Sequence, residues 1–383
     1  MSSSPTPTIF DGHNDTVLKF LREQVNDDPP RAFFERSETG HLDLPRDQEG
    51  GLGGGFFAIF VPNKLKRAKK KKEEAFPGEA DEDDSVPLRY EFPLPEMVKR
   101  PYAQKTVITM MSQLFQWEDQ SEGKVKIVRN AAQLAYCLQN GIFAIIIHFE
   151  GAEAIDKSLD SLQVFYQAGL RSLGLVWSRP TRFGHGVPFS FPAAPDIGKG
   201  LTKAGKRLVK ACNELGILVD MSHLNEKGFW DVAKISDVPL VCTHSGAYAC
   251  CPSPRNLLDK QLDALAETGG VTGINFHKGF LREDGRSNKE TSVTEIVRHA
   301  AYIADRIGVD HVALGSDFDG ASMPDDLKDA AGLPKLIAAF REHGFSEEEI
   351  AKIAHGNWLR VLRQTWKGFT LARGENPMSL LSG

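Results

Sequence analysis

The chain has 383 residues, of which 41% are hydrophobic, and a formal net charge of -5. This slightly acidic balance provides no global basic surface, so nucleic acid is not an expected partner. No stretch approaches the roughly 20 apolar residues of a membrane span, and no basic region followed by an apolar run opens the chain, so we expect neither membrane insertion nor export. The five cysteines follow no metal-binding spacing, which favours reduced thiols and a cytoplasmic location.

Eight apolar, β-rich runs follow one another along the chain, and helical patterns separate most of them. The pattern over 201–216 is typical of these helices, because its apolar residues lie three and four apart and a glycine closes it. Eight alternating units of nearly continuous apolar strands predict a (β/α)8 barrel of the TIM type, with a doubly wound open sheet as the alternative. The runs are IFDGHND (9–15), FFAIFV (56–61), IFAIIIHFEG (142–151), RSLGLVWS (171–178), LGILVDMSH (215–223), PLVCTHSG (239–246), GGVTGINFH (269–277) and HVALGSDFDG (311–320).

One stretch interrupts this rhythm. Residues 63–89 contain a basic block followed by an acidic block. Blocks of like charge repel each other and stay solvated, so we interpret the stretch as a charged insertion after the second strand. A nucleic-acid or nuclear-localisation patch is the alternative, although the acidic run would largely cancel it. Helical patterns over 326–344 and 346–366 then complete the outer ring, so a single domain is predicted over 1–383.

Ionisable residues stand at the ends of most predicted strands. The carboxyl ends of barrel strands meet on one face, where barrel enzymes keep their chemistry. A single ionisable residue at a strand end would more often have a structural role. Several such residues, each at the same position of a repeating β/α unit, indicate a functional site. Imidazoles with carboxylates suit a dinuclear zinc centre, in which two metals about 3.5 to 4 Å apart make hydroxide available near neutral pH. The set comprises His13, Asp15, His148, Glu150, His223, His244, His277, Asp317 and Asp319.

The motifs DGHND, HFEGAEAI, DMSH, THSGA, SPRN and GSDFDG, in this order from residue 11 to 320, resemble the membrane (renal) dipeptidase family, peptidase family M19, of the amidohydrolase superfamily. The resemblance covers nearly the whole chain. It implies a zinc dipeptidase with two zinc ions per chain, acting on free dipeptides, including those with a C-terminal D-residue. By this resemblance His13 and Asp15 hold one zinc, Glu150 bridges, and His223 and His244 hold the other. Dimers are common in the family, so the resemblance suggests a homodimer.

The resemblance also implies roles outside the metal ligands. Asp317 matches the general base and acid, and Arg255 matches the arginine that holds the C-terminal carboxylate of the substrate, a task suited to a two-pronged guanidinium. Trp177 stands where family members often carry a substrate-contacting histidine. His185, between glycines in FGHG, is the candidate to replace it, and an incidental loop residue is the alternative. His277 stands where related sequences often have tyrosine, so it is a further candidate substrate contact. The chain resembles the soluble bacterial branch.

Two other functions remain open from the sequence. A related amidase acting on N-acyl amino acids or cyclic amides would use the same metals with a different pocket. A binding protein that keeps the barrel without turnover is the third hypothesis. The complete set of matching ligands argues against it, because a relic would be expected to have lost at least one.

Overall fold

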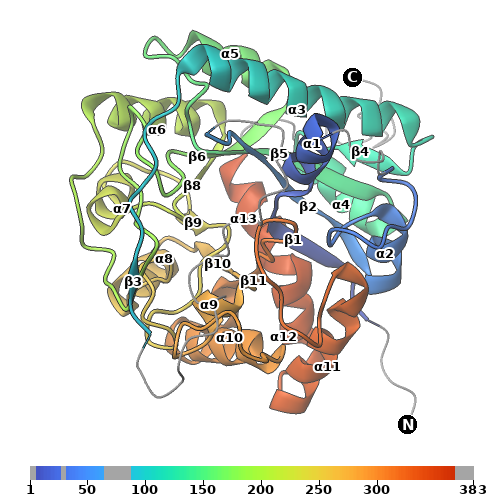
Figure 1. The fold of residues 1–383 in the computed structure, drawn as a ribbon. Helices are drawn as coiled ribbons and strands as arrows, with labels where there is room; N and C mark the ends of the chain where they lie inside the picture. Colours follow the sequence, from blue (N-terminus) through green and yellow to red (C-terminus); the bar gives the residue numbers. More distant parts are fainter. Residues whose placement is uncertain (1–5, 27–31, 64–87, 367–383) are drawn as a thin grey trace.

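The computed structural model describes residues 6–26, 32–63 and 88–366. Eight parallel strands lie at its centre and helices surround them (Figure 1). Each strand falls within one of the eight predicted runs or overlaps it, so the predicted (β/α)8 barrel is confirmed. In their order around the barrel, the strands are β1 (Ile9–Asn14), β2 (Leu52–Phe60), β5 (Phe143–Glu150), β6 (Leu170–Gly174), β8 (Leu218–Asp220), β9 (Val241–Cys242), β10 (Val271–Ile274) and β11 (Val312–Leu314).

The barrel closes between its first and last strands. A parallel bridge joins Asn14 to Phe318, just beyond the end of β11. The Asp15 N–H donates to the Phe318 carbonyl at 2.7 Å, and the Asp317 N–H donates to the His13 carbonyl at 2.9 Å. The hydrogen bonds that close the barrel are therefore made by predicted site residues and their neighbours.

The helices follow the predicted pattern. The helix predicted over 201–216 is α6 (Lys203–Leu215), which Thr202 caps by accepting the Gly205 N–H at 3.0 Å, and which Gly216 ends at φ 73°. The predicted C-terminal helices are α11 (Leu333–His343), α12 (Glu347–Ala351) and α13 (Asn357–Thr365), with a short π-helix at Lys352–Gly356. The other helices are α1 (Thr16–Asn26), α2 (Leu44–Gly50), α3 (Arg100–Gln120), α4 (Ala131–Asn140), α5 (Asp160–Gln167), α7 (Glu226–Ala233), α8 (Asp259–Glu267), α9 (Lys278–Leu281) and α10 (Thr294–Ile307), with 3-10 turns at Val309–His311 and Ala330–Gly332.

Three short strands were not predicted. β4 (Val125–Ile127) pairs with β5 alongside the barrel, and β3 (Tyr90–Glu91) forms an antiparallel pair with β7 (Ser190–Phe191). None of the three lies in a long apolar run of the kind that marks the barrel strands. Most of the predicted charged insertion, residues 64–87, lies outside the described residues. No helix in the described part of the chain is long and apolar enough to cross a membrane.

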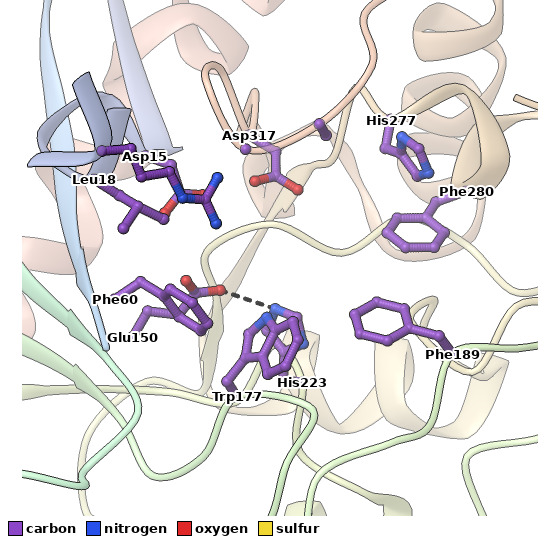
Figure 2. A pocket seen from close by; sticks show the side chains of 13 residues that line it. Asp15, Leu18, Phe60, Glu150, Trp177, Phe189, His223, His277, Phe280 and Asp317 are labelled. Carbon is purple, nitrogen blue, oxygen red and sulfur yellow. Dashed lines mark ion pairs between the residues drawn. The ribbon is translucent and has the colours of Figure 1, made fainter. Parts of the chain in front are cut away.

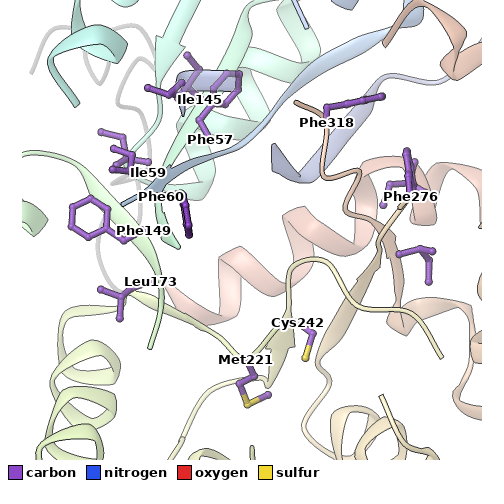
Figure 3. Packing of buried hydrophobic residues seen from close by; sticks show 14 of the residues in the cluster. Phe57, Ile59, Phe60, Ile145, Phe149, Leu173, Met221, Cys242, Phe276 and Phe318 are labelled. Atoms are coloured by element: carbon purple, nitrogen blue, oxygen red, sulfur yellow. The ribbon is translucent and has the colours of Figure 1, made fainter. Parts of the chain in front are cut away.

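Two large clusters make up most of the hydrophobic core. Side chains such as Phe57, Ile145 and Phe149 belong to a large cluster between strands and helices (Figure 3). A second cluster gathers residues of most barrel strands around Trp358 of α13, whose Nε1–H donates to the Leu314 carbonyl at 3.0 Å. A Cβ at Gly12 would lie 2.5 Å from the Trp358 ring, so glycine is required there. Trp358 thus packs among residues of the barrel strands.

Candidate metal centre

The five predicted metal ligands converge at the carboxyl ends of four strands. His13 is the penultimate residue of β1 and Asp15 follows that strand, Glu150 is the last residue of β5, His223 follows β8, and His244 follows β9. All five are buried, with at most 6% of each residue exposed. Their convergence follows from the parallel barrel, which brings its strand ends to one face.

A single carboxylate oxygen lies at the centre of this cluster. Glu150 Oε1 is 3.0 Å from His223 Nε2, 3.6 Å from His244 Nε2 and 3.7 Å from His13 Nε2. Figure 2 shows Glu150 and His223 facing each other. His13 Nε2 also lies 3.7 Å from Asp15 Oδ2. The ligand atoms of His13, Glu150 and His244 lie within 4.8 Å of one another, as do those of His13, Asp15 and Asp317. The site therefore has two overlapping ligand groups that share His13.

The electrostatics of the cluster fit a bound cation. Burial and the nearby Asp15 raise the pKa of Glu150 well above its usual value, whereas burial and Arg255 lower the pKa values of His223 and His244. Burial alone would lower the pKa of His13, but Glu150 and Asp15 outweigh it and raise that pKa to about 10. Among the described residues, both ring nitrogens of His13 and Oδ1 of Asp15 are buried without a hydrogen-bond partner. Buried orphan donors and acceptors of this kind suit metal coordination.

The hydrogen bonds behind His244 fix its tautomer. Thr243 Oγ1 donates its proton to Asp220 Oδ2 at 2.8 Å, so the same hydroxyl must accept from His244 Nδ1, which lies 2.8 Å away. The lone pair of His244 is therefore on Nε2, toward Glu150. Ser178 Oγ lies 3.0 Å from His223 Nδ1 and helps to hold that ring in place. Such outer partners orient metal-binding imidazoles.

Asp317 lies in a strained turn beyond β11. Its backbone has φ 63°, a left-handed conformation that Asp and Asn adopt more readily than most residues. Its Oδ2 accepts from Asn275 Nδ2 at 2.8 Å, and the Asn275 Oδ1 accepts the His277 N–H at 2.7 Å. Burial and the nearby Asp15 raise the pKa of Asp317. One carboxylate oxygen is thus held by the amide, and the side chain lines the cavity.

Asp319 has a different environment, although it belongs to the same GSDFDG motif. Its Oδ1 accepts the His41 N–H at 2.7 Å, and its own N–H donates to His41 Nδ1 at 2.8 Å. Nearby, Ser316 donates its N–H and its hydroxyl to the Asp11 carboxylate at 2.7 and 2.8 Å. Asp319 and Asp11 therefore hold the loop that carries Asp317.

A cavity of about 140 Å³ opens above the carboxylates. Aromatic rings supply much of its wall, and Trp177 connects several of them: its ring centroid is 5.0 Å from Phe60, 5.3 Å from Phe189 and 5.9 Å from His223. Figure 2 shows Leu18 and Phe280 at opposite ends, with Glu150 and Asp317 between them. The lining residues are Asp15, Leu18, Arg22, Phe60, Glu150, Trp177, Phe189, His223, His277, Phe280, Asp317, Gly320 and Ala321.

The structure thus brings two of the four predicted substrate contacts into the cavity wall. Trp177 and His277 line it, and burial lowers the pKa of His277 to about 4, so this ring is neutral at pH 7. His185 is half-buried and is not among the lining residues; its carbonyl accepts the Asn225 N–H at 3.2 Å. Its substrate role stays a prediction.

Arg255 lies beneath the wall rather than in it. The guanidinium is buried, donates from Nη2 to the His244 carbonyl at 3.1 Å and packs over the Phe280 ring at 5.5 Å. Within the described part of the chain, its Nε has no hydrogen-bond partner. Arg255 therefore retains donor capacity beside Phe280.

Sequence reasoning missed several residues that shape the site. Asn275 could have been found, because it is a polar residue at a predicted strand end, like the ligands. Phe189 and Arg22 carried no such signal, since the first lies in a long loop after β6 and the second lies on α1, seven residues beyond Asp15. Only the folded chain places them at the cavity.

A closed (β/α)8 barrel whose mouth gathers imidazoles and carboxylates defines a metal-dependent hydrolase. Residues 5–369 match the family described as membrane dipeptidase (peptidase family M19). The chain therefore belongs to this family, and its enzyme class is that of a metallo-dipeptidase.

Individual relatives agree with this family. A solved metallo peptidase from Rhodobacter sphaeroides, liganded with a phosphinate mimic of the dipeptide L-Ala-D-Ala, is 48% identical, with 94% of this chain and 100% of that chain covered and a TM-score of 0.87. Dipeptidase tcpJ of Claviceps purpurea (strain 20.1) is 29% identical over 358 residues, 92% of this chain and 76% of the relative. An uncharacterized protein in the pqqA 5' region of Klebsiella pneumoniae is 49% identical over 247 residues, 64% of this chain and 91% of the relative.

Proposed function

We propose that this metallo-dipeptidase works with two zinc ions and hydrolyses free dipeptides, including those that end in a D-residue. His13 and Asp15 would hold one ion, His223 and His244 the other, and Glu150 both. The observation that carries the proposal is Glu150 Oε1, which faces the Nε2 atoms of imidazoles from three strands at 3.0 to 3.7 Å. The dipeptide mimic bound by the Rhodobacter sphaeroides relative supports a D-residue at the second position.

The bound ions would polarise the scissile carbonyl and acidify a water. The chain's own residues would then handle the protons. Asp317 keeps one oxygen on Asn275 at 2.8 Å, so its other oxygen is oriented to take a proton from the attacking water and return it to the leaving amine.

Arg255 would read the C-terminal carboxylate of the substrate. Its spare Nε donor and its position beside Phe280 support this role, because a charged guanidinium can bind a carboxylate with two parallel hydrogen bonds. Trp177 and His277 would contact the substrate from the cavity wall. Substrate contact by His185, a cytoplasmic location, a homodimer and a single domain over 1–383 stay predictions from the sequence.

Metal analysis tests the zinc assignment. We expect two zinc ions per chain in active protein, loss of dipeptide hydrolysis after chelation, and recovery when zinc is restored. Glu150→Gln keeps the size of the side chain but removes the shared charge, so it should lower both zinc content and activity. Active wild-type protein with one zinc or none would contradict the proposal.

A second experiment separates the dipeptidase from a general amidase. We would measure kcat/KM for L-Ala-L-Ala, L-Ala-D-Ala and their C-terminal amides, with the wild type, Arg255→Lys and Arg255→Ala. The loss of a charge-assisted hydrogen bond, roughly 1.5 to 3 kcal/mol, should lower the acid's kcat/KM about tenfold to a hundredfold in Arg255→Ala. The wild type should discriminate against the amides, and the alanine variant should not. Equal hydrolysis of acid and amide by the wild type would favour an amidase.

A further inference from the structure

A second arginine lies at the cavity, and no role described above uses it. Arg22 is on α1, one turn after Leu18, and lines the cavity with an exposed side chain. It is the one Lys or Arg among the lining residues. Within the described residues, no carboxylate lies within ion-pair distance of its guanidinium. A cation at a cavity wall without a protein partner can pair with an anionic group on a ligand.

Arg22 lies in the wall of the cavity, and Arg255 lies behind Phe280, toward the opposite end. Arg255 packs on Phe280, and Arg22 follows Leu18 on the same face of α1. Figure 2 shows Leu18 and Phe280 at the two ends, with Glu150 and Asp317 between them. A dipeptide with its C-terminal carboxylate at Arg255 and its peptide bond over the carboxylate cluster would therefore direct its first residue toward α1.

We infer that Arg22 selects the first residue of the substrate, so that the enzyme favours dipeptides with an N-terminal Asp or Glu over those with Lys or Arg. This inference rests on the proposed function, since the orientation of the dipeptide comes from Arg255. Leu18 and Phe60 offer apolar surface to the methylene stem of such a side chain, and Arg22 offers the charge for its carboxylate. Because Arg22 is exposed, the effect is one of preference and not an absolute requirement.

The substrate set isolates charge from shape. Glu-Ala, Gln-Ala and Lys-Ala differ at the first side chain, and Glu and Gln are almost the same size. For the wild type we expect kcat/KM for Glu-Ala to exceed that for Gln-Ala about two- to fivefold at low salt, as for an exposed ion pair. Lys-Ala should be the poorest of the three. High salt should reduce the preference, because screening weakens exposed charge pairs.

Variants then assign the preference to Arg22. Arg22→Gln should remove the difference between Glu-Ala and Gln-Ala, and Arg22→Glu should make Lys-Ala better than Glu-Ala. Lys19→Glu is the matched control, because it makes the same charge change on the same helix at a residue that does not line the cavity. It should leave the wild-type order unchanged.

The outcomes are distinguishable. If Arg22→Glu keeps the wild-type order of substrates, or Lys19→Glu inverts it equally well, Arg22 does not select the first residue, although dipeptide hydrolysis stands. If the wild type cleaves none of the three dipeptides or L-Ala-L-Ala, the proposed function fails and this inference fails with it.

Discussion

Replacing Asp317 by Asn tests whether this side chain moves protons or binds metal. In the wild type, Asp317 Oδ2 accepts from Asn275 Nδ2 at 2.8 Å, and the backbone N–H of residue 317 donates to the His13 carbonyl at 2.9 Å. An Asn side chain keeps an oxygen that can accept the first bond, and its backbone can still donate the second. The backbone at φ 63° is also well tolerated by Asn, whereas Ala would add strain of about 1 kcal/mol. The substitution therefore removes the base and little else.

Loss of a general base typically costs about 10² to 10⁴ in rate. We expect kcat for L-Ala-D-Ala to fall within that range, with KM and zinc content close to those of the wild type. Asp319→Asn is the matched control: it makes the same change in the same motif at the same φ of 63°, but in a side chain that binds His41. It should change kcat by only a few-fold. A loss of zinc in Asp317→Asn would show that Asp317 is a ligand, and near-normal turnover would show that it is not the base.

Two further predictions concern residues behind the site. Asn275→Ala removes the hydrogen bond that holds one oxygen of Asp317. Because a hydrogen bond to a charged group is worth about this much, kcat should fall about ten- to hundredfold while the zinc content stays unchanged. An unaltered kcat would refute the positioning role of Asn275. His299 is buried far from these ligands in sequence, accepts the Ala247 N–H at 3.0 Å, and has its pKa lowered to about 4, chiefly by burial. In the unfolded chain this histidine takes up a proton near pH 6.5, whereas in the folded protein it stays neutral down to about pH 4. The free energy of unfolding should therefore fall as the pH drops from 6.5 to 4, by roughly 3 kcal/mol from this residue. Urea unfolding of the chelated wild type and of His299→Gln over this pH range measures how steeply the stability of each protein depends on pH.

The barrel and the strand-end positions of its candidate ligands were predictable for one physical reason. Parallel strands buried on both faces leave apolar runs in the sequence, and polar residues at their ends then stand out. His13, Glu150 and His244 stand out in this way, because each interrupts or ends an apolar run at the same phase of the repeat, and the family resemblance then singles them out as candidate ligands.

The cavity wall could not be predicted by that reasoning. Phe189 lies in the long connection after β6, and Arg22 lies on the helix after β1, so neither carries a strand-end signal. The depth of Arg255 also depends on tertiary packing, since SPRN reads as a surface turn yet the guanidinium packs over Phe280. Candidate specificity residues such as Arg22 therefore had to be found in the structure, whereas the candidate ligands could be found in the sequence.

The carboxylates of the site are costly to the fold without cations. Asp15, Glu150 and Asp317 lie together at the barrel mouth, and burial with mutual repulsion raises the pKa values of Glu150 and Asp317. A protein selected for stability alone would replace such groups with apolar residues, since burying unpaired charge is unfavourable. Divalent cations turn the same repulsion into attraction. The clustered carboxylates that destabilise the metal-free barrel therefore favour metal binding. Membership in a metallo-dipeptidase family is consistent with this geometry.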